Sequence, residues 1–570
     1  MSARLKIGLI VDQEELSKFD YEFIQWAKST KLIWISHLIV QTRSSPVYIR
    51  PLIGQILNRK PIERIRGILW KTLWAIKARV EMRTLEGIPE FADRASKFIT
   101  RDSIPGRIFI APRISSSGFV DCFSAEELRK IQAECFDLLI HVGSGILRGE
   151  ILHSARFGVL AFHHGDSRAN RGGPTGFWEV YHEEPLTGFL VQRLTEDHDG
   201  GDILLRGVVP TQRSHVLNHA MLLTKSYRHL QKLLVRIAEE GELPQFEVQV
   251  PYSGPLYVRP RAGQIAGYLA KRVRRSLKGR IRDIRGLKER WGVSYVRSHW
   301  RDAAYWRGKQ LEVRPGHFLA DPFVVSRDGR TCVFVEDYLY PIGRAHISVF
   351  ELGEGGAHEI GIALEEPFHL SFPFLFEYQG QLFMCPESCQ SREIRIYRCT
   401  EFPLHWTLET VAMRGIAAAD TMIFQFDGCW WLFTNVSESE PHVFNTELHI
   451  FFATDPISGN WKPHRRNPVL MTSDCARNGG LLWDAGGAFR VGQRQGYGSY
   501  GASAQVMRIG KLNELEYVEE PVCQLTPGFD RGLCGTHHLH SDGTYSVWDY
   551  KRWERPSSRS QRLSNPENGK

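Results

Sequence analysis

Long apolar segments and clustered cysteines are scarce in this sequence of 570 residues. No run of about eighteen apolar residues occurs, so we expect no membrane span. The start, MSARLKIGLIVDQEELSKF, has too short an apolar run for a signal peptide and becomes acidic at once. The ten cysteines are scattered, and none belongs to a cluster with zinc spacing. We therefore expect reduced thiols, no bound metal and a cytoplasmic protein.

A dinucleotide fingerprint is also missing. No G-x-G-x-x-G follows the first apolar run, residues 5–11, so a dinucleotide cofactor is not indicated. Hydrophobic residues make up 42% of the chain and charged residues 24%, which is typical of a folded globular protein. The net charge of +8 is compatible with an anionic small ligand. It does not require nucleic acid, and we expect no nucleic-acid partner.

The length predicts more than one domain, and the first pattern along the chain is α/β. The apolar run at 5–11 is followed by a helical pattern, FDYEFIQWAKST, and by a second apolar run, LIWISHLIV. Strand, helix and strand in this order open a doubly wound, Rossmann-like domain. Residues 50–100 are rich in Lys, Arg and Leu and predict helices of an insertion. We place this domain at residues 1–251.

A basic segment follows, which we assign to a helical linker at residues 252–300. Between 258 and 292, apolar residues recur at roughly helical spacing among many Lys and Arg. Such a helix can be a solvated linker that packs on its own domains. It can also make peripheral contact with an anionic membrane surface. The sequence leaves both interpretations open.

From Gly316 the pattern changes to short strands rich in Phe, Trp, Tyr and Val, separated by turns with Gly, Asp and Asn. Similar units begin about fifty residues apart, as expected for four-stranded propeller blades. Two of them start with related phrases, ADPF at Ala320 and ADTM at Ala419. We predict a five-bladed β-propeller over 301–553 and a disordered polar tail over 554–570. The fold class is thus multidomain, α/β plus all-β.

One stretch of the first domain, residues 136–207, carries a recognisable series. It contains FDLLIHVGSGILRGEIL, FHHGDSRANRGGP and LTGFLVQRLTEDHDGGDILLRG. This series resembles the catalytic core of the 10-formyltetrahydrofolate-dependent formyltransferases, such as methionyl-tRNA and sugar N-formyltransferases. The resemblance implies transfer of a formyl group from 10-formyltetrahydrofolate to an amine. The site must then move a proton and stabilise a tetrahedral intermediate.

The resemblance assigns a catalytic histidine and aspartate. Arg171 follows His163 by eight residues and Asp199 follows it by thirty-six, as in the family. The string His164-Gly165 also resembles the family's His-Gly-Ser, so His163 and His164 both remain candidates beside Asp199. The family's Asn, two residues before its His, is replaced by Ala161 or Phe162, depending on the register. Neither side chain donates a hydrogen bond, so a slow or inactive site is an alternative outcome.

The resemblance also implies a folate site. The loop that contacts the pterin and formyl end corresponds to GSGILR, and the Arg-Gly follows the histidine. The implied cofactor-binding residues are Gly143, Ser144, Gly145, Ile146, Leu147, Arg171 and Gly172.

The second half resembles the N-terminal domain of glucosamine inositolphosphorylceramide transferase and, more distantly, propellers of the glycoside hydrolase family 43 type. The resemblance rests on ADPFVV, FVEDY, the CPES turn, AADTMIF and the ARNGG…YG pattern. It implies a central channel that binds a glycan or glycolipid head group. The candidate residues are Asp321, Glu387, Asp420 and His537. Glu387 precedes the second Asp, whereas the hydrolase acid usually follows it, which favours binding over cleavage.

These patterns together predict a formyltransferase whose acceptor is a small amine, and the propeller points to an amino sugar in glycan or glycolipid biosynthesis. Two alternatives remain. The propeller is a glycosidase or glycosyl-transfer module with an auxiliary first domain, or both halves only bind ligands.

Overall fold

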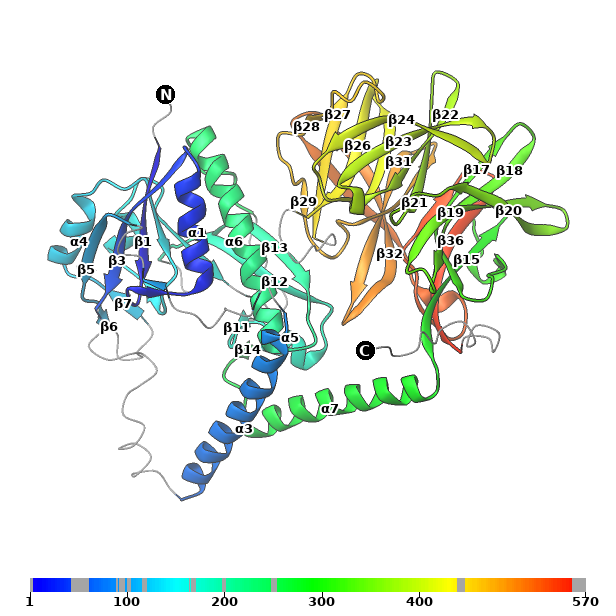
Figure 1. Ribbon diagram of the computed structural model, residues 1–570. Helices are drawn as coiled ribbons and strands as arrows, with labels where there is room; N and C mark the ends of the chain where they lie inside the picture. The colour runs from blue at the N-terminus through cyan, green and yellow to red at the C-terminus, as the bar shows by residue number, and fades with distance from the viewer. Residues whose placement is uncertain are drawn as a thin grey trace, which may run out of the picture. The chain divides into compact units, whose positions relative to one another are not determined.

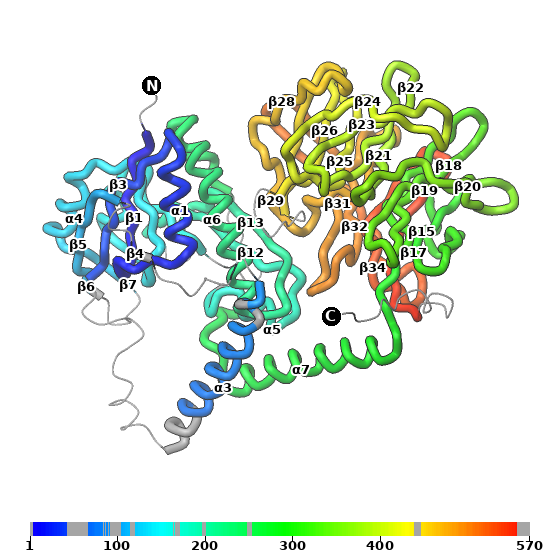
Figure 2. Tube along the Cα trace, in the orientation of Figure 1, coloured from blue at the N-terminus to red at the C-terminus, as the bar shows by residue number. Residues whose placement is uncertain are grey.

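The computed structural model describes residues 4–42, 61–88, 91, 98–99, 104–114, 120–163, 165, 171–196, 201–247, 254–437 and 446–555. The chain forms two compact units, Met1–Arg272 and Val273–Lys570. The first unit is α/β and the second is all-β apart from the end of one long helix, which confirms the predicted fold class (Figure 1; Figure 2). Among the described helices, none has the length and apolar character needed to cross a membrane.

A seven-stranded sheet forms the centre of the first unit, in the order β13-β12-β10-β8-β1-β3-β5. The five strands β10, β8, β1, β3 and β5 are parallel, and β12 and β13 add an antiparallel edge. The bounds are β1 Leu5–Val11, β3 Ile33–Gln41, β5 Gly106–Ile110, β8 Leu138–His141, β10 Val159–His163, β12 Leu186–Arg193 and β13 Asp202–Pro210. The strand order reverses between β1 and β8, and ligands of such sheets bind outside the carboxyl ends at this point.

Three small sheets of short strands accompany this central sheet. They are β2 Glu15–Leu16 with β4 Phe98–Ile99, β6 Arg113–Ile114 with β7 Val120–Cys122 and β9 Ile146–Leu147, and β11 Arg171–Gly172 with β14 Leu256–Tyr257.

Helices α1 Lys18–Ser29 and α6 His215–Glu240 pack together through Phe19, Phe23 and Tyr227. Ser17 and Asp20 form a capping box at the start of α1. The other helices of this unit are α4 Ala125–Gln132, α5 Phe177–His182 and the 3-10 helix η2 Glu150–His153.

Helix α3, Pro61–Glu86, lies in the predicted insertion. Its buried Lys77 and Glu81 pair at 2.7 Å. Glu81 also accepts hydrogen bonds from Tyr268 and Arg272 of helix α7, Ala262–Ile284. A buried charge is stable only with such partners, so this cluster fastens α3 and the start of α7 to one another. Of the predicted insertion, residues 50–60, 89–90, 92–97 and 100 lie outside the described residues.

Five sheets form the blades of the propeller. The first two blades comprise β17 His317–Arg327, β18 Arg330–Leu339, β19 Arg344–Gly353 and β20 Gly356–Leu364, then β21 Ser371–Tyr378, β22 Gln381–Glu387, β23 Glu393–Glu401 and β24 His405–Arg414. The third and fourth comprise β25 Ala418–Phe426, β26 Cys429–Val436, β27 Glu447–Ala453, β28 Lys462–Pro463 and β29 Leu470–Met471, then β30 Asn478–Asp484, β31 Gly487–Gly496, β32 Ser499–Leu512 and β33 Tyr517–Leu525. Three 3-10 helices, η3 Tyr305–Arg307, η4 Cys389–Ser391 and η5 Pro527–Phe529, lie between strands.

The fifth blade joins the two ends of the propeller. It contains β34 Leu533–Gly535, β35 Leu539–Ser541 and β36 Ser546–Glu554, together with β15 Lys288–Val296 and β16 Lys309–Gln310. β15 pairs with β36 along its whole length, from Lys288 to Val296. This pairing closes the ring, because a strand from the start of the unit completes the last blade. The strand β15 lies within the segment assigned to the linker, and residues 556–570 of the predicted tail lie outside the described residues.

Four blades repeat one irregularity in their first strand. The register of pairing shifts after Ala320, Ser371, Ala419 and Asn478. In three of these bulges the next residue has a positive φ, 49° at Asp321, 45° at Phe372 and 49° at Asp420. Such backbone is uncommon for residues other than glycine, and bulges often redirect a side chain beside a functional site.

Candidate functional site

The loop that follows β8 contains the predicted folate-binding residues Gly143–Leu147. Asp12, just after β1, accepts hydrogen bonds from the backbone nitrogen and the hydroxyl of Ser144, at 2.8 and 2.6 Å. A Cβ on Gly143 would lie 2.8 Å from Asp12 Oδ1, so this close approach requires glycine. Ile146 is half exposed, whereas Leu147 is buried in the core. The structure thus presents the first part of the loop at the surface and uses Leu147 for packing.

A cavity of about 220 Å³ opens beside this loop. It lies at the carboxyl ends of β8 and β10 and next to the segment after β1, where the strand order reverses. Its lining comes from α1, the β8 loop, β10 and α6: Ser17, Phe19, Asp20, His141, Val142, Gly143, Phe162, His219, Leu223 and Tyr227. This is the position at which doubly wound sheets bind small ligands.

One wall of the cavity carries a buried phenol. The hydroxyl of Tyr227 donates to the carboxylate of Asp20. Burial, followed by the nearby Asp20 charge, raises the pKa of Tyr227 well above its usual value. The tyrosine therefore stays protonated at neutral pH and serves as a hydrogen-bond donor.

Of the predicted catalytic residues, only His163 lies within the described part of the chain. It is the last residue of β10, is half-buried and pairs with Leu190 of β12. Side chains alternate along a strand, so His163 lies on the face opposite to Phe162, which lines the cavity. Ala161, which takes the place of the family's Asn in this register, shares the face of His163 and is buried.

His164 and Asp199 lie outside the described residues. Glu196, the last described residue before Asp199, accepts hydrogen bonds from the side chain of Arg148 and from the backbone of Gly149, each within 3.0 Å. Glu196 therefore lies beside the end of the GSGILR loop.

The Arg171-Gly172 pair forms the short strand β11, which is parallel to Leu256–Tyr257. Gly172 has a φ of 108°, and a Cβ there would lie 1.9 Å from the carbonyl oxygen of Tyr257. This glycine is therefore required by the backbone itself. The side chain of Arg171 lies outside the described residues.

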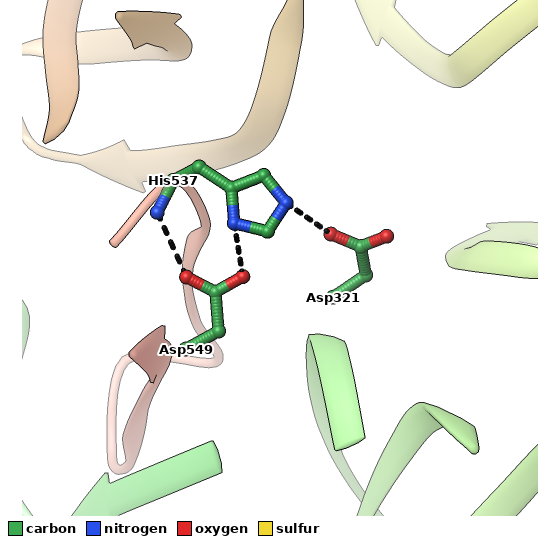
Figure 3. A group of neighbouring side chains, drawn as sticks. All are labelled: Asp321, His537 and Asp549. Atoms are coloured by element: carbon green, nitrogen blue, oxygen red, sulfur yellow. Dashed lines mark hydrogen bonds and ion pairs between the residues drawn. The ribbon is translucent and has the colours of Figure 1, made fainter. Parts of the chain in front are cut away.

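In the propeller, the four predicted residues come together through shared partners. Arg477 donates to Asp420 at 2.6 Å, and its Nη2 lies 3.8 Å from Glu387. His537 Nε2 lies 3.5 Å from Asp321 Oδ1 (Figure 3). These residues come from blades one, two, three and five, with Arg477 between blades three and four.

Asp549 of β36 holds the histidine in place. One carboxylate oxygen accepts from the backbone nitrogens of His537 and His538, at 2.8 and 3.1 Å. The other contacts His537 Nδ1, as Figure 3 shows. Burial alone would lower the pKa of His537, but the Asp549 and Asp321 carboxylates outweigh it and raise this pKa. The imidazolium form is thereby favoured between two carboxylates.

The cluster concentrates negative charge out of water. Glu336 of β18, opposite the first bulge, joins Asp321, Glu387, Asp420 and Asp549. Burial, together with the Asp420 and Asp549 charges and against the opposing His537, raises the pKa of Asp321 to about 7. Burial and the neighbouring carboxylates also raise the pKa of Glu336 and of Glu387 well above the usual value. At neutral pH part of this group is therefore protonated.

Gln493 Oε1, on a residue that is 1% exposed, has no hydrogen-bond partner among the described residues. Asp321 Oδ1, on a residue that is 6% exposed, accepts no hydrogen bond there either, and its 3.5 Å contact with His537 Nε2 is an ion pair. The amide nitrogen of Gln493 already donates to Asp420 and to the carbonyl of Asn478. Buried acceptors without donors favour a ligand that brings hydroxyl or ammonium groups.

The ligand atoms of Asp321, His537 and Asp549 lie within 4.8 Å of one another, close enough to hold a metal ion. The two Asp549 oxygens, however, already contact the imidazole and two backbone amides. This donor set fits an orienting contact to His537 better than an open coordination site.

Sequence reasoning missed Glu336, Arg477, Gln493 and Asp549. Glu336 and Arg477 lie in the FVEDY and ARNGG strings that carried the propeller resemblance, so these strings held the available signal. Gln493 and Asp549 belong to later strands of their blades, which no repeated phrase marked.

Comparisons with known proteins match the two halves to different relatives. Residues 309–530 match the family model described as glucosamine inositolphosphorylceramide transferase 1, N-terminal. Glucosamine inositolphosphorylceramide transferase 1 of Oryza sativa subsp. japonica is 38% identical over 213 residues, which cover 36% of this chain and 28% of the rice protein. The alignment thus spans little more than a quarter of that relative.

Methionyl-tRNA formyltransferase of Bacillus mycoides (strain KBAB4) is 25% identical over 253 residues, 42% of this chain and 77% of the bacterial enzyme. Among solved structures, the catalytic domain of Coprinopsis cinerea GH62 alpha-L-arabinofuranosidase aligns with a TM-score of 0.34 and 11% identity, over 47% of this chain and 98% of its own. The chain is therefore similar both to formyltransferases and, in its propeller, to glucosamine inositolphosphorylceramide transferase 1, as the sequence motifs predicted.

Proposed function

We propose that this protein transfers a formyl group from 10-formyltetrahydrofolate to the amine of an amino sugar, and that the propeller holds the carbohydrate part of this substrate. The observation that carries the first part is the cavity at the reversal of strand order, bordered by the loop that resembles a folate-binding loop. The similarity to methionyl-tRNA formyltransferases supports the same chemistry.

The reaction requires one proton to move. The amine nitrogen attacks the formyl carbon, a carbon–nitrogen bond forms, and the bond to N10 of the folate breaks. The proton lost by the amine ends on N10, so the overall charge balances. In this proposal His163 or His164 accepts and returns that proton, and Asp199 stabilises the imidazolium.

The absence of the family's Asn sets the expected rate. An oxyanion-stabilising donor is worth about two to three orders of magnitude in rate. Ala161 and Phe162 cannot supply it. We therefore expect turnover to be slow unless a donor from another part of the site, such as Asn170 or the second histidine, takes this role.

Formyl transfer should be measured with purified full-length protein, 10-formyltetrahydrofolate and a panel of amino sugars. His163→Ala, His164→Ala and Asp199→Asn are compared with His153→Ala, an exposed histidine outside the site. We expect the catalytic histidine variant and Asp199→Asn to lose at least about a hundredfold in kcat. Full turnover in both site-histidine variants would contradict the assignment.

For the propeller we propose binding of an amino-sugar or glycolipid head group by the acidic cluster. The observation that favours it is the buried Gln493 Oε1, which has no hydrogen-bond partner among the described residues, in a cluster whose Asp321 Oδ1 accepts no hydrogen bond either. The name of the rice relative points to the same substrate class, a glycosylated inositolphosphorylceramide. If the first unit is an inactive transferase-like domain, this binding is the remaining function.

Binding should be measured on a glycan array with the full-length chain. Asp321→Ala and Asp420→Ala are compared with Asp328→Ala, which changes an exposed turn residue of the same first blade. We expect retention of glycans with free amino groups, and loss of that retention in the first two variants only. Equal retention of glycans by all three variants would show that the acidic cluster does not bind them.

A further inference from the structure

We propose that helix α7 docks this protein onto an anionic lipid bilayer, with the helix lying in the plane of the membrane surface. The docking element is an apolar stripe formed by Val273, Leu277, Ile281 and Ile284. These side chains are 58%, 51%, 48% and 85% exposed. Exposed contiguous apolar surface of this kind is uncommon unless it meets a partner.

The stripe follows from the helical repeat. Residues four, eight and eleven positions after Val273 return to the same side of an α-helix, within about 80° of its circumference. α7 is one uninterrupted helix from Ala262 to Ile284 (Figure 1). The apolar side chains therefore form one continuous line along its second half.

Basic side chains border the stripe on both sides. Arg274, Lys278 and Arg285 flank one edge and Arg280 the other, and all four are exposed. Between 262 and 285 the sequence has eight Lys or Arg residues and one acidic residue, Asp283. This distribution favours a negatively charged partner surface that also accepts apolar side chains.

The opposite side of α7 is already occupied. Near its start, Ile265 and Tyr268 are buried. Further along, the guanidinium groups of Arg275 and Arg282 lie over the rings of Tyr497 and Trp553, at 4.8 and 4.0 Å. Protein contacts thus cover one side of the helix, and the apolar stripe is left on the other.

A lipid surface fits these features best. Interfacial helices combine an apolar face with flanking Lys and Arg, so that apolar side chains enter the acyl boundary while the cations meet anionic head groups. The helix lacks the apolar length needed to span the bilayer. A glycolipid substrate would lie in the same surface, although the docking stands on α7 alone.

The test is co-sedimentation of the full-length protein with vesicles of phosphatidylcholine alone and of phosphatidylcholine with phosphatidylserine. The stripe variant Leu277→Glu/Ile281→Glu is compared with Leu515→Glu/Val518→Glu, which places the same charges on exposed apolar residues of the propeller, 54% and 47% exposed. We expect wild type and the propeller variant to bind anionic vesicles. The stripe variant should lose at least about tenfold in partition coefficient.

A second variant, Arg274→Glu/Lys278→Glu, separates charge from apolar contact. It should weaken binding to anionic vesicles, and added salt should weaken the wild type. The proposal fails if wild type does not bind anionic vesicles, or if the stripe variant binds like wild type. It also fails if the stripe instead holds two copies together, which would appear as a dimer that only the stripe variant dissociates.

Discussion

Replacing Asp321 by Asn should stabilise the propeller at high pH and have little effect at low pH. The carboxyl group is buried among other carboxyls, and its pKa is raised from the usual 3.8 to about 7. The side chain of Asn has the same shape and cannot ionise. Asn also tolerates the positive φ of 49° at this position, so the substitution tests the charge alone.

The sign follows from proton binding. Between pH 4 and pH 7 the folded state holds a proton on Asp321 that the unfolded state has lost. The free energy of unfolding of the wild type is therefore highest below pH 4 and decreases as the pH rises to 7. A difference of about three pKa units corresponds to about 4 kcal/mol in total. Of this, about 3 kcal/mol falls between pH 5 and pH 8. The Asn variant has no ionisable group at position 321, so its free energy of unfolding does not decrease in this way.

The assay is urea unfolding of the full chain at pH 5 and pH 8, followed by tryptophan fluorescence. Ten of the fifteen tryptophans belong to the second unit, so the signal follows propeller unfolding. The control is Asp328→Asn, whose side chain is 73% exposed in the neighbouring turn. The stability difference between Asp321→Asn and wild type should rise by about 3 kcal/mol from pH 5 to pH 8. A difference that stays constant with pH would show that the pKa of Asp321 is not raised in the folded state.

Two further substitutions test other buried features. Arg490→Met should destabilise the propeller by about 3–5 kcal/mol in urea unfolding, because the buried Glu519 carboxylate, bonded to Arg490 at 2.6 and 2.8 Å, would lose its cationic partner. A loss below about 1 kcal/mol would show that water reaches this pair. Gly172→Ala should disrupt the β11–β14 pairing through its clash with Tyr257, seen as faster hydrogen exchange in that segment, whereas Gly173→Ala meets no atom within 4 Å. Equal exchange in both alanine variants would contradict this account.

The propeller blades and the aspartates at their starts were predictable because the same strand pattern and the same Ala-Asp phrase recur along the sequence. The phrase Ala-Asp at 320–321 and at 419–420 marks the bulge, and the bulge places both carboxyls in the cluster. Asp549 carries no such mark. It meets His537 because the last strand completes the fifth blade beside β15, and this closure links residues that local sequence patterns cannot relate.

The sequence could not decide between His163 and His164 as the catalytic histidine, because the two are adjacent in the sequence. Neighbouring residues of a strand point to opposite faces, so His163 and His164 exchange faces with a shift of one position. The motif spacing favours one and the local string favours the other. Phe162 lines the cavity and alternation places His163 on the other face, while His164 lies outside the described residues, so both histidines remain candidates.

In the proposed reaction, a formyl group leaves a folate and is transferred to an amine. The most direct measurement is mass spectrometry of amino sugars incubated with the full-length protein and 10-formyltetrahydrofolate labelled with ¹³C in the formyl group. We expect a product that carries the labelled formyl group on its nitrogen, and we expect Asp199→Asn to slow its formation at least about a hundredfold. Recovery of only unmodified amino sugars, with no saturable binding of the folate to the protein, would contradict the proposed formyl transfer.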